Sequence, residues 1–375
     1  MYKIEKMIPE DIELTLIPHL SPAMLARLVE CFGSAEAIFA APREELMGIA
    51  KIPLNAIDNI LARSMREDAL REAQACSKRS IRPIAATDAE YPPSLWVCAD
   101  RPHVIYTVGR VDLLRREVVT MVGTRRSSSY GQRAAAMLVD ALAINASQVA
   151  IASGLAYGID SAVHRAAMEA HIPTICVMPS ALPTITPSSQ VSLAREIVRS
   201  GGLVMSEANS HSKQAGRNYQ ARNRILAGLG AATVVVESAK SGGSLMTAAK
   251  ARGYGRTVGA VVGRITDSKS EGCNDLIAAE LARPITSVDE LYKILDWQRR
   301  AEVDKPAAQD PLEGLSPSER AVALCFKDRE RLSLGELIEL SGLGYSEMSV
   351  ILLALELRGL VQDVRGNMYE REFEI

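Results

Sequence analysis

The sequence predicts an α/β protein built on a mostly parallel, doubly wound β-sheet. Six apolar runs of strand length alternate with helical stretches through the middle of the chain, and parallel strands need such crossover connections. Short helices with glycine turns precede this region, and three helices with a glycine-turned hairpin follow it. A helical module and a winged helix are therefore expected at the two ends.

Residues 1–80 are expected to form a wholly helical domain. Ser21-Pro22 begins one helix and Gly33-Ser34 interrupts the pattern, after which further helices are expected from Pro42 and from about Leu54. Serine before proline is a helix-start signal, and glycine is typical of a helix end. Short helices joined by glycine turns favour a small domain of the helix-hairpin-helix type or similar. The alternative is a packing module without a ligand.

Residues 81–298 are assigned to the central α/β domain. A connecting stretch with Tyr91-Pro92-Pro93 and His103–Tyr106 leads into it, and the segment from about Gln132 to Ala146 has helical periodicity. Short apolar runs bounded by turn residues are typical of buried parallel strands. The strand candidates are Val118–Val122, Gln148–Ala152, Pro173–Met178, Gly202–Ser206, Ala232–Val236 and Val258–Val262.

Residues 299–312 are assigned to a linker, because they are charged, contain proline and lack an apolar period. Residues 313–375 are assigned to a winged helix whose hairpin turns at Gly366-Asn367. Ser316-Pro317-Ser318-Glu319 is expected to cap its first helix. The three helices are expected at Ser316–Phe326, Leu334–Ser341 and Ser346–Arg358.

Composition indicates a soluble, cytoplasmic protein. The chain has 375 residues, of which 47% are hydrophobic, enough for at least one large core. Its six cysteines are scattered without a CxxC pair, which favours reduced thiols, and its five histidines lack metal-ligand spacing. No apolar run approaches the ~20 residues of a membrane span, and the first residues do not resemble a signal peptide. We therefore expect no metal and no membrane contact.

The formal net charge of −2 conceals an asymmetry along the chain. From Arg115 to Arg256 there are 16 Lys plus Arg and 7 Asp plus Glu, a difference of +9. From Glu313 to Ile375 the corresponding counts are 7 and 12, a difference of −5. The central region is therefore expected to attract a polyanion, and the C-terminal region to repel one.

The turn Gly123-Thr124-Arg125-Arg126 follows the first strand candidate and precedes a helix. Open α/β sheets bind ligands at the carboxyl ends of their strands. A helix start offers free N–H groups, and a guanidinium can bind phosphate through two hydrogen bonds. This turn is therefore a candidate anion site, and the alternative is an ordinary turn with solvated arginines. Because it lacks the GxGxxG spacing of a dinucleotide site, no nicotinamide or flavin cofactor is expected.

Other turns should gather at the same sheet edge. Ser153-Gly154 follows the second strand candidate, and Asp160 can cap the next helix. Lys240-Ser241-Gly242-Gly243-Ser244 is a second candidate for a phosphate-binding turn. Glu207 and Glu237 end two further strands, where a capping or ion-pair role is expected. Several helix starts on one edge favour a bound anion.

Basic residues also cluster around Tyr219, namely Arg217, Arg222, Asn223 and Arg224. Arginines that hold a phosphate backbone and a ring that stacks on a base suit a single-stranded nucleic acid. The alternative is a solvated helix face, with Asn223 bonded inside the fold.

Five motifs in order, and at these spacings, resemble the DNA-processing protein A family (DprA, also called Smf). They are VGTRRSSSYG, SGLAYGIDSAVHRAA, RNRILAGL, VVVESAKSGGSLMTAAKA and GCNDLI, and the similarity runs from about Tyr91-Pro92-Pro93 to Leu291. The resemblance implies an extended Rossmann-like domain that binds single-stranded DNA in a basic crevice, forms a homodimer and loads RecA recombinase during natural transformation. It also supports an N-terminal SAM-like domain and a C-terminal winged helix.

By position, Gly123 and Arg125 match the family's Gly-Ser/Thr-Arg phosphate site, and Arg222-Asn223-Arg224 matches its Arg-Asn-Arg. Two segments depart from the family. Asn218-Tyr219-Gln220 stands where His-Phe-Pro is usual, and Thr186-Pro187-Ser188-Ser189-Gln190 stands where Tyr-Pro, often with a basic residue and Asn, is common. Both departures fall in or near the expected crevice.

The sequence thus favours a recombination mediator that binds single-stranded DNA, protects it and has no catalysis of its own. One alternative is a nucleotide-binding hydrolase of N-glycosidic bonds, but the Gly242-Gly243 turn lacks the acid such an enzyme needs just beyond it. Glu207 and Glu237 could replace that acid only if they lay close together. A purely structural adaptor, the third possibility, leaves the basic turns unexplained.

Overall fold

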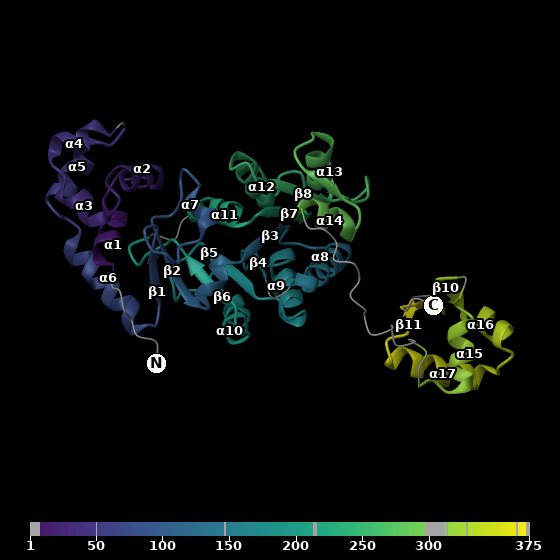
Figure 1. Cartoon of the computed structure of the whole chain (residues 1–375). Helices are drawn as coiled ribbons and strands as arrows, with labels where there is room; N and C mark the ends of the chain where they lie inside the picture. The colour runs from purple at the N-terminus through teal and green to yellow at the C-terminus, as the bar shows by residue number, and fades with distance from the viewer. Residues whose placement is uncertain are drawn as a thin grey trace. The chain divides into compact units, whose positions relative to one another are not determined.

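The central part of the chain folds around a nine-stranded sheet in the order β1-β2-β6-β5-β4-β3-β7-β8-β9 (Figure 1). The computed structural model describes residues 8–49, 51–145, 148–212, 216–296, 312, 314–327, 329–364 and 367–372. From β3 the chain adds strands outward to β6, and then crosses back to place β7 on the other side of β3. The strands are β1 (Arg82–Ala85), β2 (Val104–Gly109), β3 (Glu117–Gly123), β4 (Val149–Ser153), β5 (Thr174–Met178), β6 (Leu203–Ser206), β7 (Ala232–Glu237), β8 (Thr257–Val261) and β9 (Arg283–Ile285).

The reversal at β3 confirms the predicted doubly wound α/β fold. The six strand candidates are β3 to β8, and every end lies within one residue of the prediction. Strands β3 to β9 run parallel to their neighbours, except that β6 also pairs antiparallel with β2. Strands β1, β2 and β9 were not predicted. β1 and β9 are short edge strands that contain Pro83 and Pro284, and proline is tolerated at an edge because its missing N–H faces away from the sheet.

Helices cover both faces of this sheet, with α11, α12 and α13 on one face and α8, α9 and α10 on the other (Figure 1). Alternate residues of each strand enter the two cores, as in β3, where Val118 and Val122 face α11 while Val119 and Met121 face α8 and α9. The helices of this part are α7 (Pro93–Trp96), α8 (Ser129–Leu142), α9 (Ile159–Glu169), α10 (Val191–Arg199), α11 (Gly216–Leu229), α12 (Gly243–Gly253), α13 (Glu271–Ala278) and α14 (Val288–Ile294), with short 3₁₀ segments at Val111–Arg115, Ala143–Asn145 and Ser188–Gln190.

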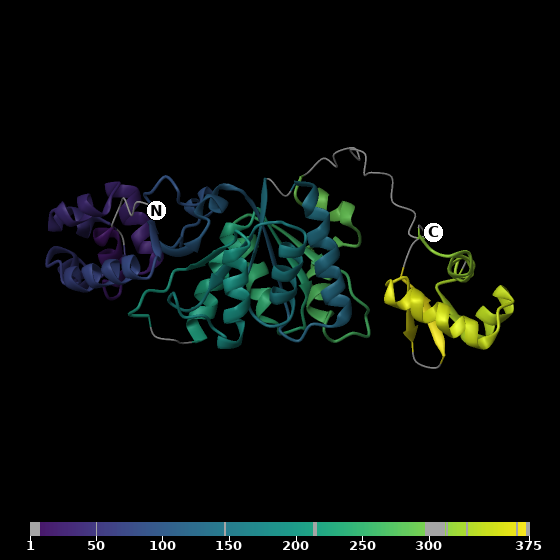
Figure 2. The ribbon, with the colours of Figure 1, turned by 90° about the horizontal axis from the view of Figure 1, so that it is seen from below.

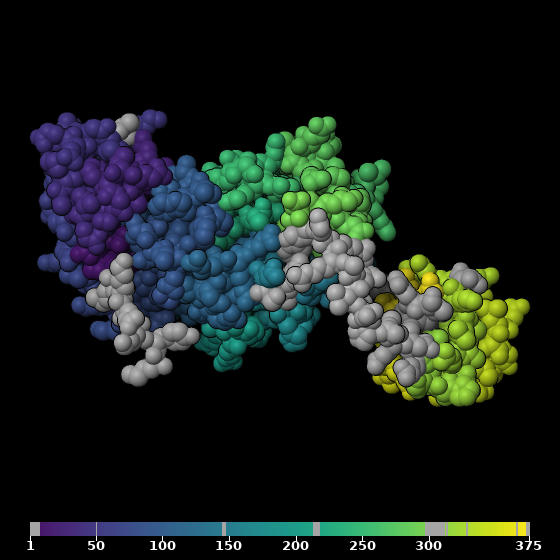
Figure 3. Space-filling model, viewed as in Figure 1, coloured from purple at the N-terminus to yellow at the C-terminus, as the bar shows by residue number. Residues whose placement is uncertain are grey.

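The residues before β1 are helical, as expected, and have a small core of their own. Ser21 caps α2 through its Oγ, which accepts a hydrogen bond from Met24 N at 3.4 Å, and Gly33 ends the helix with a φ of +83°. Helices α1 and α6 also pack on β2 and β5, so this helical module and the central sheet form one continuous body (Figure 3). The helices are α1 (Pro9–Leu16), α2 (Pro22–Phe32), α3 (Ala35–Ala40), α4 (Arg43–Gly48), α5 (Leu54–Leu61) and α6 (Arg66–Lys78).

The chain forms two compact units, Met1–Gln298 and Arg299–Ile375. The second unit has the predicted winged-helix topology, with a three-stranded sheet in the order β10-β12-β11 (Figure 2). Ser316 and Glu319 form the predicted capping box. Strand β10 was not predicted. The elements are α15 (Pro317–Leu324), β10 (Arg331–Ser333), α16 (Leu334–Ser341), α17 (Tyr345–Leu357), β11 (Val361–Val364) and β12 (Met368–Arg371).

The proposed domain boundary at residue 80 remains a prediction. The proposed linker also remains a prediction, because residues 299–311 lie outside the described residues. In the described parts of the chain, no single helix is long and apolar enough to cross a membrane. Helices α16 and α17 reach that length and composition only as a pair bent by 108°.

Candidate nucleic-acid interface

The parallel strands of the central sheet end at one edge, where Gly123, Ser153, Ser206 and Glu237 lie. The strand order reverses between β3 and β7, and the connections after these strands diverge to opposite faces. In open α/β sheets this switch point is where a crevice for ligands forms. The structure therefore places the β3–α8 turn and the β7–α12 turn together.

The β3–α8 turn is held by main-chain hydrogen bonds from both sides. Thr124 N donates to Glu237 O at 2.7 Å, and Ile159 N donates to Thr124 O at 3.1 Å. A Cβ at Gly123 would lie 2.5 Å from Ile159 Cγ1, so this position has no room for a larger residue. These contacts fix the turn in place before any ligand arrives.

The Glu237 side chain secures the start of α8. Its carboxylate accepts hydrogen bonds from Ser128 N, at 2.8 Å, and from Ser128 Oγ, while Ser128 Oγ in turn accepts from Gly131 N at 3.0 Å. A carboxylate at this position also interacts favourably with the positive end of the α8 dipole. Glu237 therefore has the capping role that the sequence analysis assigned to it.

Arg125 and Arg126 extend from this fixed turn into solvent. The Arg125 guanidinium lies over the ring of Tyr219, 5.2 Å from its centroid, although the two residues come from the β3–α8 turn and from α11. The main chain of Arg126 is bonded within the turn, because its N donates to Thr124 Oγ1 at 3.2 Å. The Arg126 side chain is exposed. This edge of the sheet thus presents two exposed arginines, one of which lies over an aromatic ring.

Arg222 is buried beneath the crevice, with an exposed fraction of 6%. Its Nη1 donates to Gly154 O at 2.5 Å and to Val177 O at 2.9 Å, and its Nε donates to Asn223 Oδ1 at 3.1 Å. A Cβ at Gly154 would lie 1.8 Å from Arg222 Nη1, so the glycine makes room for the guanidinium. Burial lowers the pKa of Arg222, and Asp160 opposes that effect. Arg222 therefore ties the ends of β4 and β5 to α11.

Arg224 is also buried, and its guanidinium forms an ion pair with Glu207 at the end of β6. Burial raises the pKa of the Glu207 carboxyl, an effect that Arg224 opposes. This ion pair is the role that the sequence analysis expected for Glu207. Asn223, between the two buried arginines, donates from Nδ2 to Gly243 O at 3.5 Å, a long contact that links α11 to the start of α12.

The remaining predicted site residues divide by exposure. Lys240, Ser241 and Gly243 are exposed in the β7–α12 turn. Ser244 is buried and its Oγ donates to Ser238 Oγ at 2.8 Å, while Ser153 is buried and its Oγ donates to Met121 O at 2.7 Å. Gly242 fits closely, because a Cβ there would lie 2.2 Å from Ser238 Oγ. Arg217 lies in α11, but its side chain is outside the described residues.

The segment that departs from the family, Thr186–Gln190, is bonded to the β4–α9 loop. Tyr157, half exposed, hydrogen-bonds through its hydroxyl to Ser189 Oγ, and Gln190 Nε2 donates to Ser161 Oγ at 2.6 Å. Sequence analysis did not assign a role to Tyr157. Its place in a glycine-flanked turn after a strand candidate was the available signal, because ligands bind at the carboxyl ends of strands in open α/β sheets.

Ile265 is a second exposed residue that sequence analysis did not select. It lies in the loop after β8 with an exposed fraction of 94%. Asn274 holds this loop, because its side chain accepts from Gly263 N at 3.2 Å and donates to Gly263 O at 3.1 Å. The loop therefore lies at the carboxyl edge of the sheet, at the end of β8, the strand next to β7.

The two candidate acids, Glu207 and Glu237, lie far apart. Their strands, β6 and β7, are separated by β5, β4 and β3, and four strand spacings amount to about 19 Å. Paired carboxylates of glycoside hydrolases lie within about 5–10 Å of each other. In the described parts of the chain, no cluster of three or more His, Cys, Asp or Glu could hold a metal ion.

Comparisons with known proteins agree with this fold. A family model described as DNA recombination-mediator protein A matches residues 82–296, and one described as the DprA winged helix domain matches residues 306–367. A putative DNA processing protein DprA of Mycobacterium tuberculosis is 30% identical over 355 residues, which cover 91% of this chain and 88% of that protein.

Two solved structures extend the comparison. The X-ray structure of DNA processing protein A from Streptococcus pneumoniae has a TM-score of 0.66 and 26% identity, and the match covers 79% of this chain and all of that one. DNA processing protein A from Helicobacter pylori, whose structure concerns its single-stranded DNA binding mode, has a TM-score of 0.52 and 25% identity over 58% of this chain and 97% of that one.

Fold, motifs and matches together define a DNA-processing protein of the recombination-mediator class. The chain belongs to the DNA processing protein A family, DprA or Smf.

Proposed function

We propose that this chain binds single-stranded DNA in the crevice between the β3–α8 and β7–α12 turns and acts there as a recombination mediator. The observation that supports this most directly is the exposed Arg125 guanidinium over the Tyr219 ring on a turn fixed by hydrogen bonds. A guanidinium binds phosphate, and a ring stacks on any base without sequence preference. The related protein of Helicobacter pylori binds single-stranded DNA.

In this proposal the predicted site residues have two roles. Contacts with the strand come from Arg125, Arg126 and the exposed β7–α12 turn at Lys240. Support comes from buried or half-buried residues, most of which hydrogen-bond to groups inside the protein. The contacting set is Gly123, Thr124, Arg125, Arg126, Arg217, Lys240, Ser241, Gly242 and Gly243, and the supporting set is Ser153, Gly154, Arg222, Asn223, Arg224 and Ser244.

We propose further that the chain forms a homodimer, protects incoming strands and loads RecA recombinase. Membership of the recombination-mediator family supports this assignment. RecA assembly on strands coated with single-strand-binding protein is expected to speed up when the chain is added, measured as DNA-dependent ATP hydrolysis by RecA. An unchanged rate, with DNA binding intact, would contradict the loading role and leave the binding role standing.

The binding role is tested by a salt titration with single-stranded DNA, duplex DNA of the same length and mononucleotides. Each phosphate contact releases a condensed counterion, so the logarithm of affinity should fall linearly with the logarithm of salt concentration, by about 0.7 per contact for single strands. With single strands we expect this slope to correspond to several phosphate contacts. We expect no such slope with duplex DNA or mononucleotides. Equal affinity for single strands and duplex would contradict the proposed crevice.

The proposal has no catalytic step. Hydrolysis needs an acid or base within hydrogen-bond reach of the scissile bond, whereas Glu237 caps α8 and Glu207 pairs with Arg224. Incubation with nucleoside monophosphates is therefore expected to release no free base above a protein-free control. Release that disappears in Glu207→Gln or Glu237→Gln would instead favour the hydrolase.

A further inference from the structure

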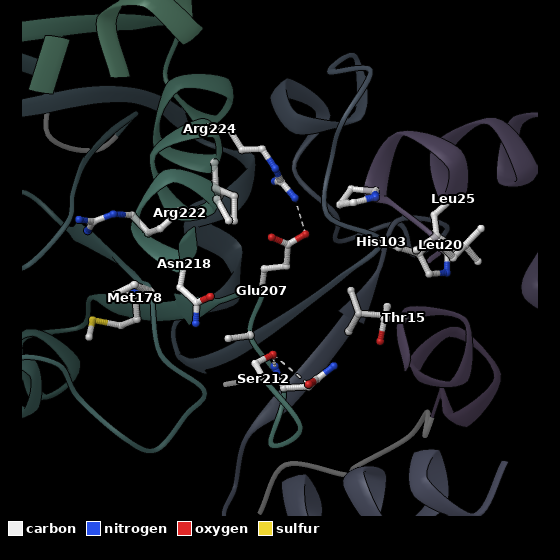
Figure 4. Close-up of a pocket in the computed structure, with 17 residues that line it drawn as sticks. Thr15, Leu20, Leu25, His103, Met178, Glu207, Ser212, Asn218, Arg222 and Arg224 are labelled. Carbon is white, nitrogen blue, oxygen red and sulfur yellow. Dashed lines mark hydrogen bonds and ion pairs between the residues drawn. The ribbon is translucent and has the colours of Figure 1, made fainter. Parts of the chain in front are cut away.

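A cavity of about 380 Å³ lies between the helical module and the carboxyl edge of the sheet (Figure 4). This volume is within the range of small-ligand sites. Leu20, Leu25 and Met178 contribute apolar walls, while Glu207, Asn218 and Arg224 contribute polar groups. In Figure 4, the Glu207 side chain lies between the α11 residues and the residues of the helical module.

The walls of this cavity are fixed by contacts outside it. His103 Nε2 lies 3.0 Å from Asp11 Oδ1, which joins α1 to the start of β2. Ser210, in the loop after β6, donates from its N to Glu72 Oε1 of α6 at 3.1 Å. Both contacts join the helical module to segments beside the sheet that border the cavity.

Two polar groups of the cavity place a hydrogen-bond donor beside a hydrogen-bond acceptor. The Glu207 carboxylate accepts from Arg224 Nη2, and carboxylate oxygens can accept further hydrogen bonds. Among the described residues, Arg224 Nη1 has no hydrogen-bond partner, although the Arg224 side chain is only 9% exposed. A buried donor without an acceptor costs free energy, and a bound ligand that supplies the acceptor would remove that cost.

The same groups do not suit a phosphate. Arg224 is neutralised by Glu207, and the Arg222 guanidinium points away from the cavity, toward the carbonyls of Gly154 and Val177 (Figure 4). A carboxylate repels a phosphate. An uncharged ring with an amino donor next to a ring acceptor, such as cytosine or adenine, complements Glu207 and Arg224 Nη1. Thymine has the reverse order, a carbonyl oxygen next to an N–H.

The cavity and the proposed DNA crevice meet at the first turn of α11. Asn218 lines the cavity, and the next residue, Tyr219, lies under the Arg125 guanidinium in the crevice. A strand whose phosphates contact Arg125 would therefore run beside the helix whose first turn lines the cavity.

We propose that this cavity receives one unstacked base of the bound strand and selects bases that have an amino group, through Glu207 and Arg224. The inference rests on the proposed function, because the strand must first bind in the crevice. It gives the chain a base preference in addition to sequence-independent phosphate binding, since each base-edge contact of this kind discriminates between bases.

The test compares the affinities of oligo-dC and oligo-dT of equal length at pH 7.5, because these pyrimidines are similar in size and differ in the amino group. We expect the native chain to bind oligo-dC at least about fivefold more tightly. Glu207→Gln should reduce the preference to within about twofold, with the salt slope unchanged. Asp112→Asn, which removes an equivalent charge at the opposite edge of the sheet, should leave the preference intact.

A second variant covers the case in which Glu207→Gln does not fold. Ala221→Leu would fill part of the cavity from α11 without removing a charge, and it should lower oligo-dC affinity to that of oligo-dT while leaving oligo-dT binding unchanged. Equal binding of both strands by the native chain would overturn the cavity proposal alone, as would a preference that persists in both variants. Failure to bind either strand would overturn the proposed function itself.

Discussion

At the residue scale, the proposed DNA-binding site contains two kinds of arginine, exposed and buried. Arg125 and Arg126 are exposed on a turn whose main chain is fixed, whereas Arg222 and Arg224 are buried and bonded inside the protein. Substitution of the first kind should change binding, and substitution of the second should change stability. The two classes can therefore be distinguished by measuring both properties on the same variants.

Arg125→Ala is expected to weaken single-stranded DNA binding by about 1–3 kcal/mol, the range for a charge-assisted hydrogen bond. Folding should be unaffected, because the Arg125 side chain is exposed and contacts the edge of the fold at the half-buried Tyr219 ring. Arg199→Ala, an exposed arginine at the C-terminal end of α10, is the matched control. If Arg125→Ala melts normally and keeps both the affinity and the salt slope, DNA does not bind at this turn.

Arg222→Ala is expected to destabilise the fold by about 2–4 kcal/mol, because it leaves the carbonyls of Gly154 and Val177 without their donor in a buried place. Urea unfolding followed by circular dichroism measures the change. Arg222→Lys should recover only part of the loss, since a single ammonium group cannot reproduce the fork of the guanidinium. A fully stable Arg222→Ala chain would show that these bonds contribute little.

The two classes of arginine cannot be distinguished from the sequence alone. Arg222 and Arg224 stand two positions apart and both are buried, an arrangement that an amphipathic helix pattern does not indicate. Their burial depends on acceptors supplied by Gly154, Val177 and Glu207, which lie directly after β4, in β5 and directly after β6. The turn at Arg125, in contrast, was predictable, because strand, glycine and helix start follow one another directly in the sequence.

At the element scale, the strength of the local signal decided what could be predicted. Strands β3 to β8 are apolar runs of four to seven residues that are buried on both faces, and each was predicted. Strands β1 and β9 have four and three residues and contain proline, so their formation depends on the edge to which they add. Their pairing with β2 and β8 is a tertiary effect that no local pattern encodes.

A buried histidine between α9 and β5 gives the central domain a pH-dependent stability. His164 is fully buried with Nδ1 2.7 Å from Thr174 Oγ1, and burial lowers its pKa to about 3. The unfolded chain, with a histidine pKa near 6.5, therefore binds a proton that the folded chain does not bind. The resulting stability is present above about pH 6.5 and is lost as the pH falls toward 3.

Between pH 7.5 and pH 5.5 this histidine should reduce the free energy of unfolding by about 1.4 kcal/mol. Urea titrations at the two pH values measure the loss in the native chain and in His164→Gln, whose side chain does not titrate. The native chain should lose more unfolding free energy between the two pH values than His164→Gln, and the difference is the contribution of His164. An identical pH dependence in both chains would mean that His164 is not the group responsible.

At the scale of the whole molecule, charge differs between the two compact units. The region from Arg115 to Arg256 has a charge of +9, with Arg125, Arg126 and Lys240 exposed at the carboxyl edge, whereas the region from Glu313 to Ile375 has a charge of −5. A polyanion should therefore bind the first unit. This distribution was available from the sequence, but the structure adds which of the basic side chains reach solvent.

The winged helix is expected to contribute little to DNA binding. Winged helices that bind DNA use a helix to contact it, but α17 contains no Lys or Arg and instead exposes Val350, Leu353 and Leu357. A chain that ends at Trp297 should therefore keep most of its affinity for single-stranded DNA and nearly all of its salt slope, because the phosphate contacts come from the first unit. Loss of most of the affinity, in a truncated chain that still melts cooperatively, would show that the second unit contacts the strand despite its negative charge.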